Sequence, residues 1–192
     1  MQQNQLPCSF YDQDAVSLAK QLLGKIFAYD NVAVRIVETE AYMPQDSASH
    51  AYKGKTQRNA PMFSSGGVLY VYLCYGMHQM INIVSGSEGS PQAVLIRAGE
   101  VIHGADIVQK RRSNLDLNGP GKFAQGLGID TSFSGERLDR RVHIWDAPSV
   151  DSFVCTPRIG IEYALPKDRD ALWRFITPLD SPKKRLVRKK KG

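Results

Sequence analysis

The pattern of hydrophobic and polar positions predicts a chain built mainly of β-strands. Val32, Val34 and Ile36 lie at every second position, as in a strand with one buried face. The range 68–75 is rich in β-branched and aromatic residues and follows two glycines, which makes it the strongest predicted strand. Further strands are predicted over 80–84, 93–98, 142–145 and 157–161, and the apolar range 172–176 is expected to pack in the core.

The predicted helices are few and short. Apolar residues recur at helical spacing over 12–23, and Gly24 is placed to end that helix. A short helix is expected over 103–112, and another begins at the turn 119–122 and runs to residue 127. At 192 residues, the chain is long enough to bury one self-sufficient core.

One predicted strand carries an unusual set of polar residues. It is the second arm of a hairpin that turns at 30–31, and its apolar face continues at period two into Glu38, Glu40 and Tyr42. Burying two carboxylates and a phenol costs free energy unless these groups find partners. These residues alone leave two interpretations open: the strand emerges into solvent, or its polar end forms a functional site.

A long segment without strand or helix signals follows, over residues 43–67. Loops of this length inside a compact domain tend to be functional or disordered. Because Tyr52, Met62 and Phe63 offer apolar anchors, the sequence favours an ordered, functional loop.

The strands beyond this loop add aromatic, amide and cationic side chains. Tyr70 and Tyr72 share one face of the strongest strand, and Tyr75 lies at its end, where the chain must turn. Asn82 falls in the middle of the returning strand, and Arg97 lies on the strand after it. Tyrosines on a buried strand usually serve packing, but this combination beside a carboxylate strand is less common.

The charge of the chain is concentrated at its C-terminal end. The net charge is +6, and residues 183–192 hold seven basic and no acidic groups. Without them, 18 basic residues face 19 acidic ones. We expect a domain over 1–182 and a basic tail over 183–192, which either attracts polyanions such as nucleic acid or only improves solubility.

Several classes of protein are disfavoured by composition. The N-terminus lacks the basic and apolar regions of a signal peptide, and no apolar run approaches the length of a membrane span. Three widely spaced cysteines argue against a disulfide framework, and the four histidines lack metal-ligand spacing. The sequence thus predicts no metal and a cytoplasmic protein, associated with the nucleoid if the source is bacterial.

These residue types together suit chemistry on a nucleobase. Aromatic faces stack on bases, and a carboxylate near a water molecule can act as a general base. An anionic group also stabilises the positive charge that develops on the sugar when a glycosidic bond breaks. An enzyme that extrudes a base from a duplex and cleaves it from its sugar would use such a set.

An ordered set of short motifs runs along the chain. These are Arg35-Ile36-Val37-Glu38-Thr39-Glu40-Ala41-Tyr42, His50, Arg58-Asn59, Met62-Phe63, Leu69-Tyr70-Val71-Tyr72, Tyr75-Gly76-Met77, Asn82-Ile83, Leu95-Ile96-Arg97 and Gly119-Pro120-Gly121-Lys122. The set resembles the motifs of a known family, the alkyladenine (3-methyladenine) DNA glycosylases of the mammalian type, over roughly residues 8–178. The resemblance implies an α+β fold, a single mixed domain with a curved antiparallel sheet flanked by helices.

The resemblance implies a monofunctional glycosylase that needs no cofactor and acts, as a monomer, on damaged purines in double-stranded DNA. Its substrates would include 3-methyladenine, 7-methylguanine, hypoxanthine and ethenoadenine. By motif position, Glu40 would activate the attacking water, and Arg97 and the backbone at Ile159 would help to hold that water.

The resemblance also implies how the damaged base would be recognised. Tyr42, His50 and Tyr72 would form the walls that stack on the flipped base. Asn82 would collide with the 2-amino group of a normal guanine. Tyr75 would enter the duplex from the minor groove and fill the gap that the flipped base leaves.

Two other functions fit parts of the sequence. A non-catalytic nucleic-acid-binding module would use the aromatic residues for stacking, but it has no need of Glu40 beside Arg97. A hydrolase of free nucleosides would have little use for Tyr75 or the basic tail. Activity on duplex DNA distinguishes the three.

Overall fold

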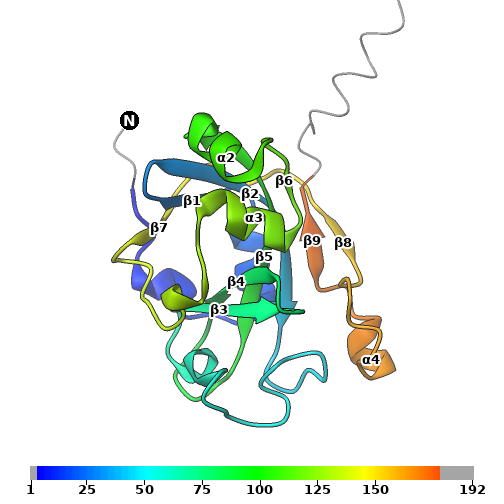
Figure 1. Cartoon of the computed structure of the whole chain (residues 1–192). Coiled ribbons are helices and arrows are strands. Elements are labelled where there is room, and N and C mark those ends of the chain that lie inside the picture. Colours follow the sequence, from blue (N-terminus) through cyan, green and yellow to red (C-terminus); the bar gives the residue numbers. More distant parts are fainter. Residues whose placement is uncertain (1–3, 178–192) are drawn as a thin grey trace, which may run out of the picture.

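The computed structural model describes residues 4–177 (Figure 1). The predicted basic tail at 183–192, and the predicted end of the domain at residue 182, lie outside the described residues.

Within these residues the chain forms one antiparallel sheet of nine strands, in which the main path runs β3-β4-β5-β2-β1-β7. β6 adds to β5, β9 adds to β2, and β8 pairs only with β9. The strands are β1 (Ile26–Tyr29), β2 (Val32–Tyr42), β3 (Leu69–Cys74), β4 (His78–Val84), β5 (Ala93–His103), β6 (Leu117–Asn118), β7 (Val142–Trp145), β8 (Val154–Thr156) and β9 (Arg174–Ile176).

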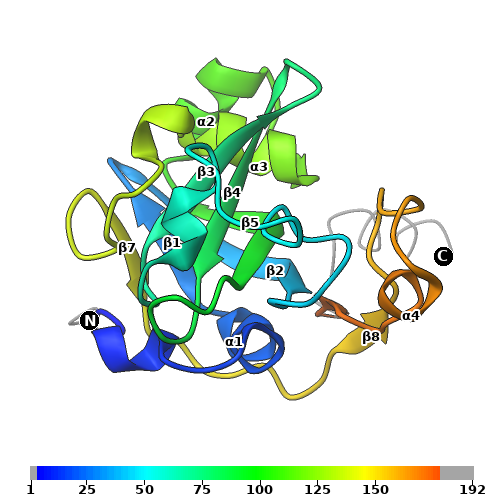
Figure 2. The same cartoon turned by 90° about the horizontal axis from the view of Figure 1, so that it is seen from below.

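Short helices cover both faces of the sheet. α1 lies on one face, and α2 and α3 lie on the other (Figure 2). The side chain of Asp14 caps α1 by accepting a hydrogen bond from the amide of Ser17. The helices are α1 (Ala15–Leu22), α2 (Ala105–Arg112), α3 (Pro120–Leu127) and α4 (Pro166–Arg169), with 3₁₀ turns η1 (Cys8–Tyr11), η2 (Ala60–Phe63) and η3 (Thr131–Phe133).

β2 is the central strand, and its two halves have different neighbours. β5 pairs with β2 along its length, whereas β1 pairs with its first half and β9 with residues 38–40. Register shifts between β2 and β5 fall on either side of Glu38. Such bulges bend a strand and increase its twist, so the sheet curves at the point where its polar residues lie.

The two faces of β2 serve different purposes. The Thr39 side chain is fully buried, and its hydroxyl donates a hydrogen bond of 2.9 Å to the carbonyl of Ala19 in α1. Because side chains alternate along a strand, Glu38 and Glu40 point to the opposite face, away from α1. The carboxylates therefore lie inside the curve of the sheet.

The β3–β4 hairpin ends in a tight turn. The amide of Met77 donates to the carbonyl of Cys74 at 3.1 Å, and the two residues between them, Tyr75 and Gly76, have φ of +49° and +69°. Positive φ at both central positions is typical of type I′ turns, which match the twist of hairpin strands. Glycine adopts this conformation without strain, but a tyrosine does so at a cost of order 1–3 kcal/mol.

The structure confirms the predicted fold class and most of the predicted elements. The strand predicted over 157–161 is wrong: β8 ends at Thr156, because the side chain of Arg158 and the amide of Ile159 turn inward to bind carboxylates instead of joining a ladder. The range 172–176 packs in the core only in part, since Phe175 is buried but Leu172 is exposed.

Close packing between β5 and α3 requires glycine at position 99. A methyl group there would overlap the side chains of Val34 and Phe123 and approach the carbonyl oxygen of Arg35 to 3.0 Å. We expect Gly99→Ala to lower the free energy of unfolding by about 1–3 kcal/mol, because the core must shift to admit the methyl group. Urea unfolding measures the change.

Gly121→Ala is the matched control, since the nearest atoms to its methyl group belong to the exposed His78, at 3.0–3.1 Å, and not to the core. Alanine is favoured over glycine in helices by about 1 kcal/mol, which offsets the shift of His78, so this variant should be destabilised less than Gly99→Ala. Equal destabilisation of the two variants would contradict the packing argument.

Candidate active site

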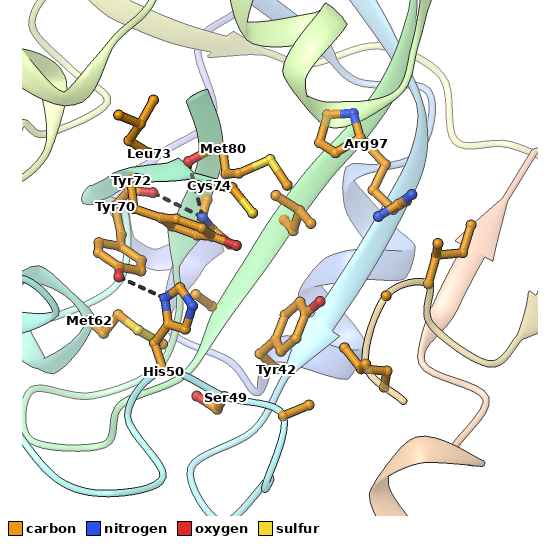
Figure 3. Close-up of a pocket in the computed structure, with 18 of the residues that line it drawn as sticks. Tyr42, Ser49, His50, Met62, Tyr70, Tyr72, Leu73, Cys74, Met80 and Arg97 are labelled. Atoms are coloured by element: carbon orange, nitrogen blue, oxygen red, sulfur yellow. Dashed lines mark hydrogen bonds between the residues drawn. The ribbon is translucent and has the colours of Figure 1, made fainter. Parts of the chain in front are cut away.

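A pocket of about 460 Å³ opens inside the curve of the sheet. It lies between the β3–β4 hairpin, β5, the end of β2, the long loop 43–67 and the segment 159–163 (Figure 3). Seven of the eight residues singled out in the sequence line it, namely Tyr42, His50, Tyr72, Tyr75, Asn82, Arg97 and Ile159. The eighth, Glu40, lies directly behind this lining, in contact with three of the seven.

Glu40 is fully buried on β2, and both of its carboxylate oxygens are hydrogen-bonded. Oε1 accepts from the backbone amide of Ile159 at 2.9 Å and lies 3.2 Å from Nη1 of Arg97. Oε2 accepts a hydrogen bond of 2.9 Å from the Tyr42 hydroxyl. A buried carboxylate needs such partners, and here each of them is also part of the pocket wall.

Opposing effects act on the charge of Glu40. Burial raises the pKa of the Glu40 carboxyl, whereas Arg97, the Ile159 amide and the Tyr42 hydroxyl lower it, and burial is the larger effect. Burial and the neighbouring Glu40 raise the pKa of Tyr42 well above its ordinary value, so this phenol remains a hydrogen-bond donor. A carboxyl group with a raised pKa is better suited to accept a proton.

A second carboxylate holds the arginine in place. Oε1 of Glu38 accepts hydrogen bonds from Nε of Arg97 at 2.9 Å and from Nε of Arg174 at 2.6 Å. Arg97 therefore bridges Glu38 and Glu40, and Arg174 on β9 supplies a second cation to this network. The sequence placed Glu38 on the same face as Glu40, but Arg174 becomes a neighbour only through the pairing of β9 with β2.

Aromatic rings form opposite walls of the pocket. Figure 3 shows Tyr72 and His50 on one side and Tyr42 across the open space from them. The ring centroids of His50 and Tyr72 are 4.4 Å apart, and Nδ1 of His50 lies 2.9 Å from the Tyr70 hydroxyl. Partial burial and the nearby charge of Arg58 lower the pKa of His50, so its ring is neutral at neutral pH.

The amide of Asn82 is fixed in the wall. It is buried, and Nδ2 donates to the carbonyls of Tyr70 at 3.0 Å and Met80 at 3.3 Å. With its nitrogen bound to two strands, the side chain cannot swing away from a ligand. The pocket lining also includes Met62, which the sequence indicated only as an apolar anchor and a motif residue, and Cys74 and Met80, which it did not single out.

Exposed apolar side chains surround the pocket mouth. Tyr75 is 87% exposed, although it is a large aromatic residue. Met77 from the same hairpin and Tyr163 from the opposite segment are also exposed. The sequence indicated Tyr75 through its position before a glycine, but Tyr163 had no such signal. Large apolar groups kept in solvent around a pocket mark a binding surface.

Within residues 4–177, no three His, Cys, Asp or Glu side chains gather as a metal site would require. No helix among the same residues is long and apolar enough to cross a membrane.

The geometry defines a class of site: an aromatic slot that can hold a planar ring, with a buried carboxylate and an arginine at its end. Comparison with known proteins identifies the family of the chain. The family model of methylpurine-DNA glycosylases matches residues 9–181. The chain belongs to the methylpurine-DNA glycosylase family, a class of DNA-repair enzymes that hydrolyse N-glycosyl bonds.

Individual relatives match over nearly the whole chain. A DNA-3-methyladenine glycosylase of Arabidopsis thaliana is 45% identical over 193 residues, which cover 94% of this chain and 76% of the plant protein. A protein of Nitrosococcus oceani, described as a candidate 3-methyladenine DNA glycosylase, is 42% identical over 92% of this chain and 91% of its own length. One of Chlamydia felis, with the same description, is 42% identical over 93% and 99%.

Removal of the buried carboxylate of Glu38 should cost more stability than removal of a carboxylate from an ion pair at the surface. Glu38→Gln leaves Arg97 and Arg174 without the carboxylate that they share, and we expect a loss of about 2–4 kcal/mol in the free energy of unfolding. Glu136→Gln removes the partner of Arg141 at the surface and should change little. Similar effects of the two substitutions in urea unfolding would contradict this assignment.

Proposed function

We propose that this protein flips alkylated or deaminated purines out of duplex DNA and hydrolyses their N-glycosidic bond with a water molecule activated by Glu40. One observation carries the proposal: a fully buried carboxylate lies at the end of an aromatic slot, held by Arg97 and the amide of Ile159. In this proposal the Arg97 and Ile159 contacts fix the carboxylate and the approach of the water.

The reaction takes the proton of the water to Glu40. The water oxygen forms a bond to C1′ of the sugar while the C1′–N bond breaks, and the electron pair of that bond stays on the purine nitrogen. A purine methylated at N3 or N7 is cationic, so it departs as a neutral base without being protonated. Hypoxanthine and ethenoadenine are neutral before the bond breaks, so each departs with the electron pair as an anion and takes up a proton from solvent. The charge that develops on the sugar is stabilised by the buried carboxylate.

The walls of the slot support a preference for damaged purines. Tyr42 on one side and Tyr72 with His50 on the other leave room for a flat ring between them (Figure 3). A cationic alkylated purine stacks favourably on aromatic faces, because the ring quadrupole attracts positive charge. The proposed substrates are 3-methyladenine, 7-methylguanine, hypoxanthine and ethenoadenine.

Selection against normal guanine is assigned to Asn82. Its two hydrogen bonds to Tyr70 and Met80 prevent it from retreating, so the amino group at C2 of guanine meets a fixed obstacle. 7-Methylguanine carries the same amino group, and in this proposal it is released despite the obstacle because its cationic base leaves more readily than normal guanine. Exclusion by a rigid group discriminates without contributing affinity for the correct base.

The mouth of the pocket supports duplex DNA as the substrate. Tyr75 projects from the hairpin turn and would fill the space of the flipped base from the minor groove. A hydrolase of free nucleosides has no use for such a residue. The proposal further assigns phosphate contacts to the seven basic residues of the tail 183–192. The enzyme is proposed to act as a monomer, and in bacteria it would act in the cytoplasm, at the nucleoid.

Loss of the carboxylate should stop the chemistry and spare binding. In single-turnover assays on duplexes with one hypoxanthine or ethenoadenine, Glu40→Gln should slow base release by at least about 100-fold. Affinity for the same duplex should persist. The rate of the unmodified enzyme should fall at acidic pH, with an apparent pKa above that of an ordinary carboxyl, since burial raises the pKa of Glu40.

Glu100→Gln is the control, because Glu100 is an exposed glutamate on β5. This variant enzyme should release bases at the same rate as the unmodified enzyme. A Glu40→Gln enzyme of full activity would exclude Glu40 as the general base. Failure of the unmodified protein on hypoxanthine, ethenoadenine and 3-methyladenine alike would favour a non-catalytic binding module.

Removal of the exposed ring should affect flipping more than folding. Tyr75→Ser takes away no core contact and should leave the melting temperature nearly unchanged. On duplex DNA at subsaturating enzyme, base release should slow by about tenfold. The flipped state loses the ring that stacks on the bases beside the gap, an interaction worth roughly 1–3 kcal/mol. On a single-stranded oligonucleotide with the same lesion, the rate should change far less. Equal slowing on both substrates would contradict the role of a wedge.

A further inference from the structure

A buried arginine outside the predicted site lies close to its centre. The guanidinium of Arg158 is fully buried, one residue before the amide that binds Glu40. It forms an ion pair with Asp46, which is also fully buried and belongs to the loop that carries His50. A buried cation needs a partner, and Asp46 supplies it here. Apolar residues could fill the same space at little or no cost in stability, so stability alone does not account for the pair.

The Arg158 side chain ties three segments together. Nη1 donates to the carbonyl of Ala41 at the end of β2 at 2.9 Å, and to Oδ2 of Asp46. Nη2 donates to Oδ1 of Asp46 at 3.0 Å and to the carbonyl of Asp168 in α4 at 3.0 Å. The fork of the guanidinium thus fixes the loop 43–50, the end of β2 and α4 relative to one another.

The same guanidinium supports a wall of the pocket. Its central carbon lies 4.6 Å from the centre of the Tyr42 ring and 5.1 Å from that of Trp173. Tyr42 is thereby held between the guanidinium and the open slot, with its hydroxyl on Glu40. A planar guanidinium against one face of an aromatic ring restricts the ring and leaves its other face free for stacking.

Two of the contacts that hold Glu40 therefore depend on one side chain. The amide of Ile159 donates to Oε1 and follows Arg158 directly in the chain, and the Tyr42 hydroxyl donates to Oε2 and rests on the guanidinium. Residue 158 lies in a segment without regular secondary structure, so no ladder of backbone hydrogen bonds would hold this amide in place.

We propose that Arg158, clamped by Asp46, is a positioning residue of the active site that sets both the Tyr42 wall and the Ile159 amide on Glu40. The inference deepens the proposed function and rests on it for its catalytic consequence. Arg158 itself does not line the pocket, so it acts through its neighbours.

The conservative substitution Arg158→Lys separates position from charge. Lysine keeps the cation beside Asp46, but a single ammonium on a flexible stem cannot donate to both Asp46 oxygens and to two carbonyls, nor lie flat on Tyr42. The Ile159 amide should then lose its fixed place, while the buried charge stays paired. Arg169→Lys is the matched control, since Arg169 lies nearby on α4 and, among residues 4–177, its side chain pairs with the exposed Asp170.

A first measurement does not depend on catalysis. The Ile159 amide donates to a buried carboxylate, so its proton resonance should lie downfield in a ¹⁵N correlation spectrum of the unmodified protein. In Arg158→Lys it should move upfield, towards the position of an amide exposed to water, and in Arg169→Lys it should stay in place. An unmoved resonance in a folded Arg158→Lys protein overturns the proposal, whether or not the chain releases bases.

A second measurement follows the chemistry. In single-turnover base release at saturating enzyme, Arg158→Lys should be at least about tenfold slower, since small misplacements in an active site have effects of this size or larger. The groups that face Glu40 are Arg97, the Tyr42 hydroxyl, the Ile159 amide and, further away, Arg158. Losing the amide contact removes an effect that lowers the pKa of Glu40, so the acidic limb of the rate profile should move to higher pH.

A purely structural role would have another outcome. The rate per folded molecule and the position of the acidic limb would then be unchanged, and only the melting temperature would fall. That result overturns the proposal. If Arg158→Lys does not fold, Asp46→Asn carries the test, because it keeps the shape of the clamp but removes its charge, and it should show the same shifts to a smaller degree. If the unmodified enzyme releases bases and Glu40→Gln does not, the proposed function holds, and a negative result for Arg158→Lys then counts against this inference alone.

Discussion

The architecture depends on the burial of the Glu40 carboxylate inside a β-sheet. An ionised group in such a place is tolerated only with charged and hydrogen-bonding partners, and these come from three segments: Tyr42 on β2, Arg97 on β5 and the amide of Ile159. Glu38, also on β2, holds Arg97 in place. The sheet must curve for these segments to meet, and the bulges on either side of Glu38 supply that curvature. Fold and site thus share one constraint.

Much of the structure could be predicted from local pattern. The β1–β2 hairpin, the β3–β4 hairpin and β7 follow from alternation, turn residues and β-branched composition, which act over a few residues. The local pattern also showed polar residues on apolar faces of these strands, whereas the roles predicted for them came from the resemblance to the glycosylase family. Their placement around one pocket then follows from the pairing of neighbouring strands.

The contacts that could not be predicted join residues far apart in the sequence. Arg158 and Asp46 are separated by 112 positions, and neither belongs to a periodic pattern. The range 157–161 was predicted as a strand because Ile159 and Ile161 alternate with smaller or polar residues, as strand residues do. Its conformation is decided by the buried carboxylates that it meets, and that information lies elsewhere in the chain.

Under the proposed function, the turn at Tyr75 has a consequence for the search along DNA. The backbone of positive φ already holds this exposed residue at the tip of the hairpin before any duplex arrives, so the backbone needs no further ordering when the ring enters the groove. The strain is stored during folding and need not be supplied at each encounter. A glycosylase that worked as proposed would test each base pair with a residue whose backbone is already set, and the stability of the pair itself would decide how long each test lasts.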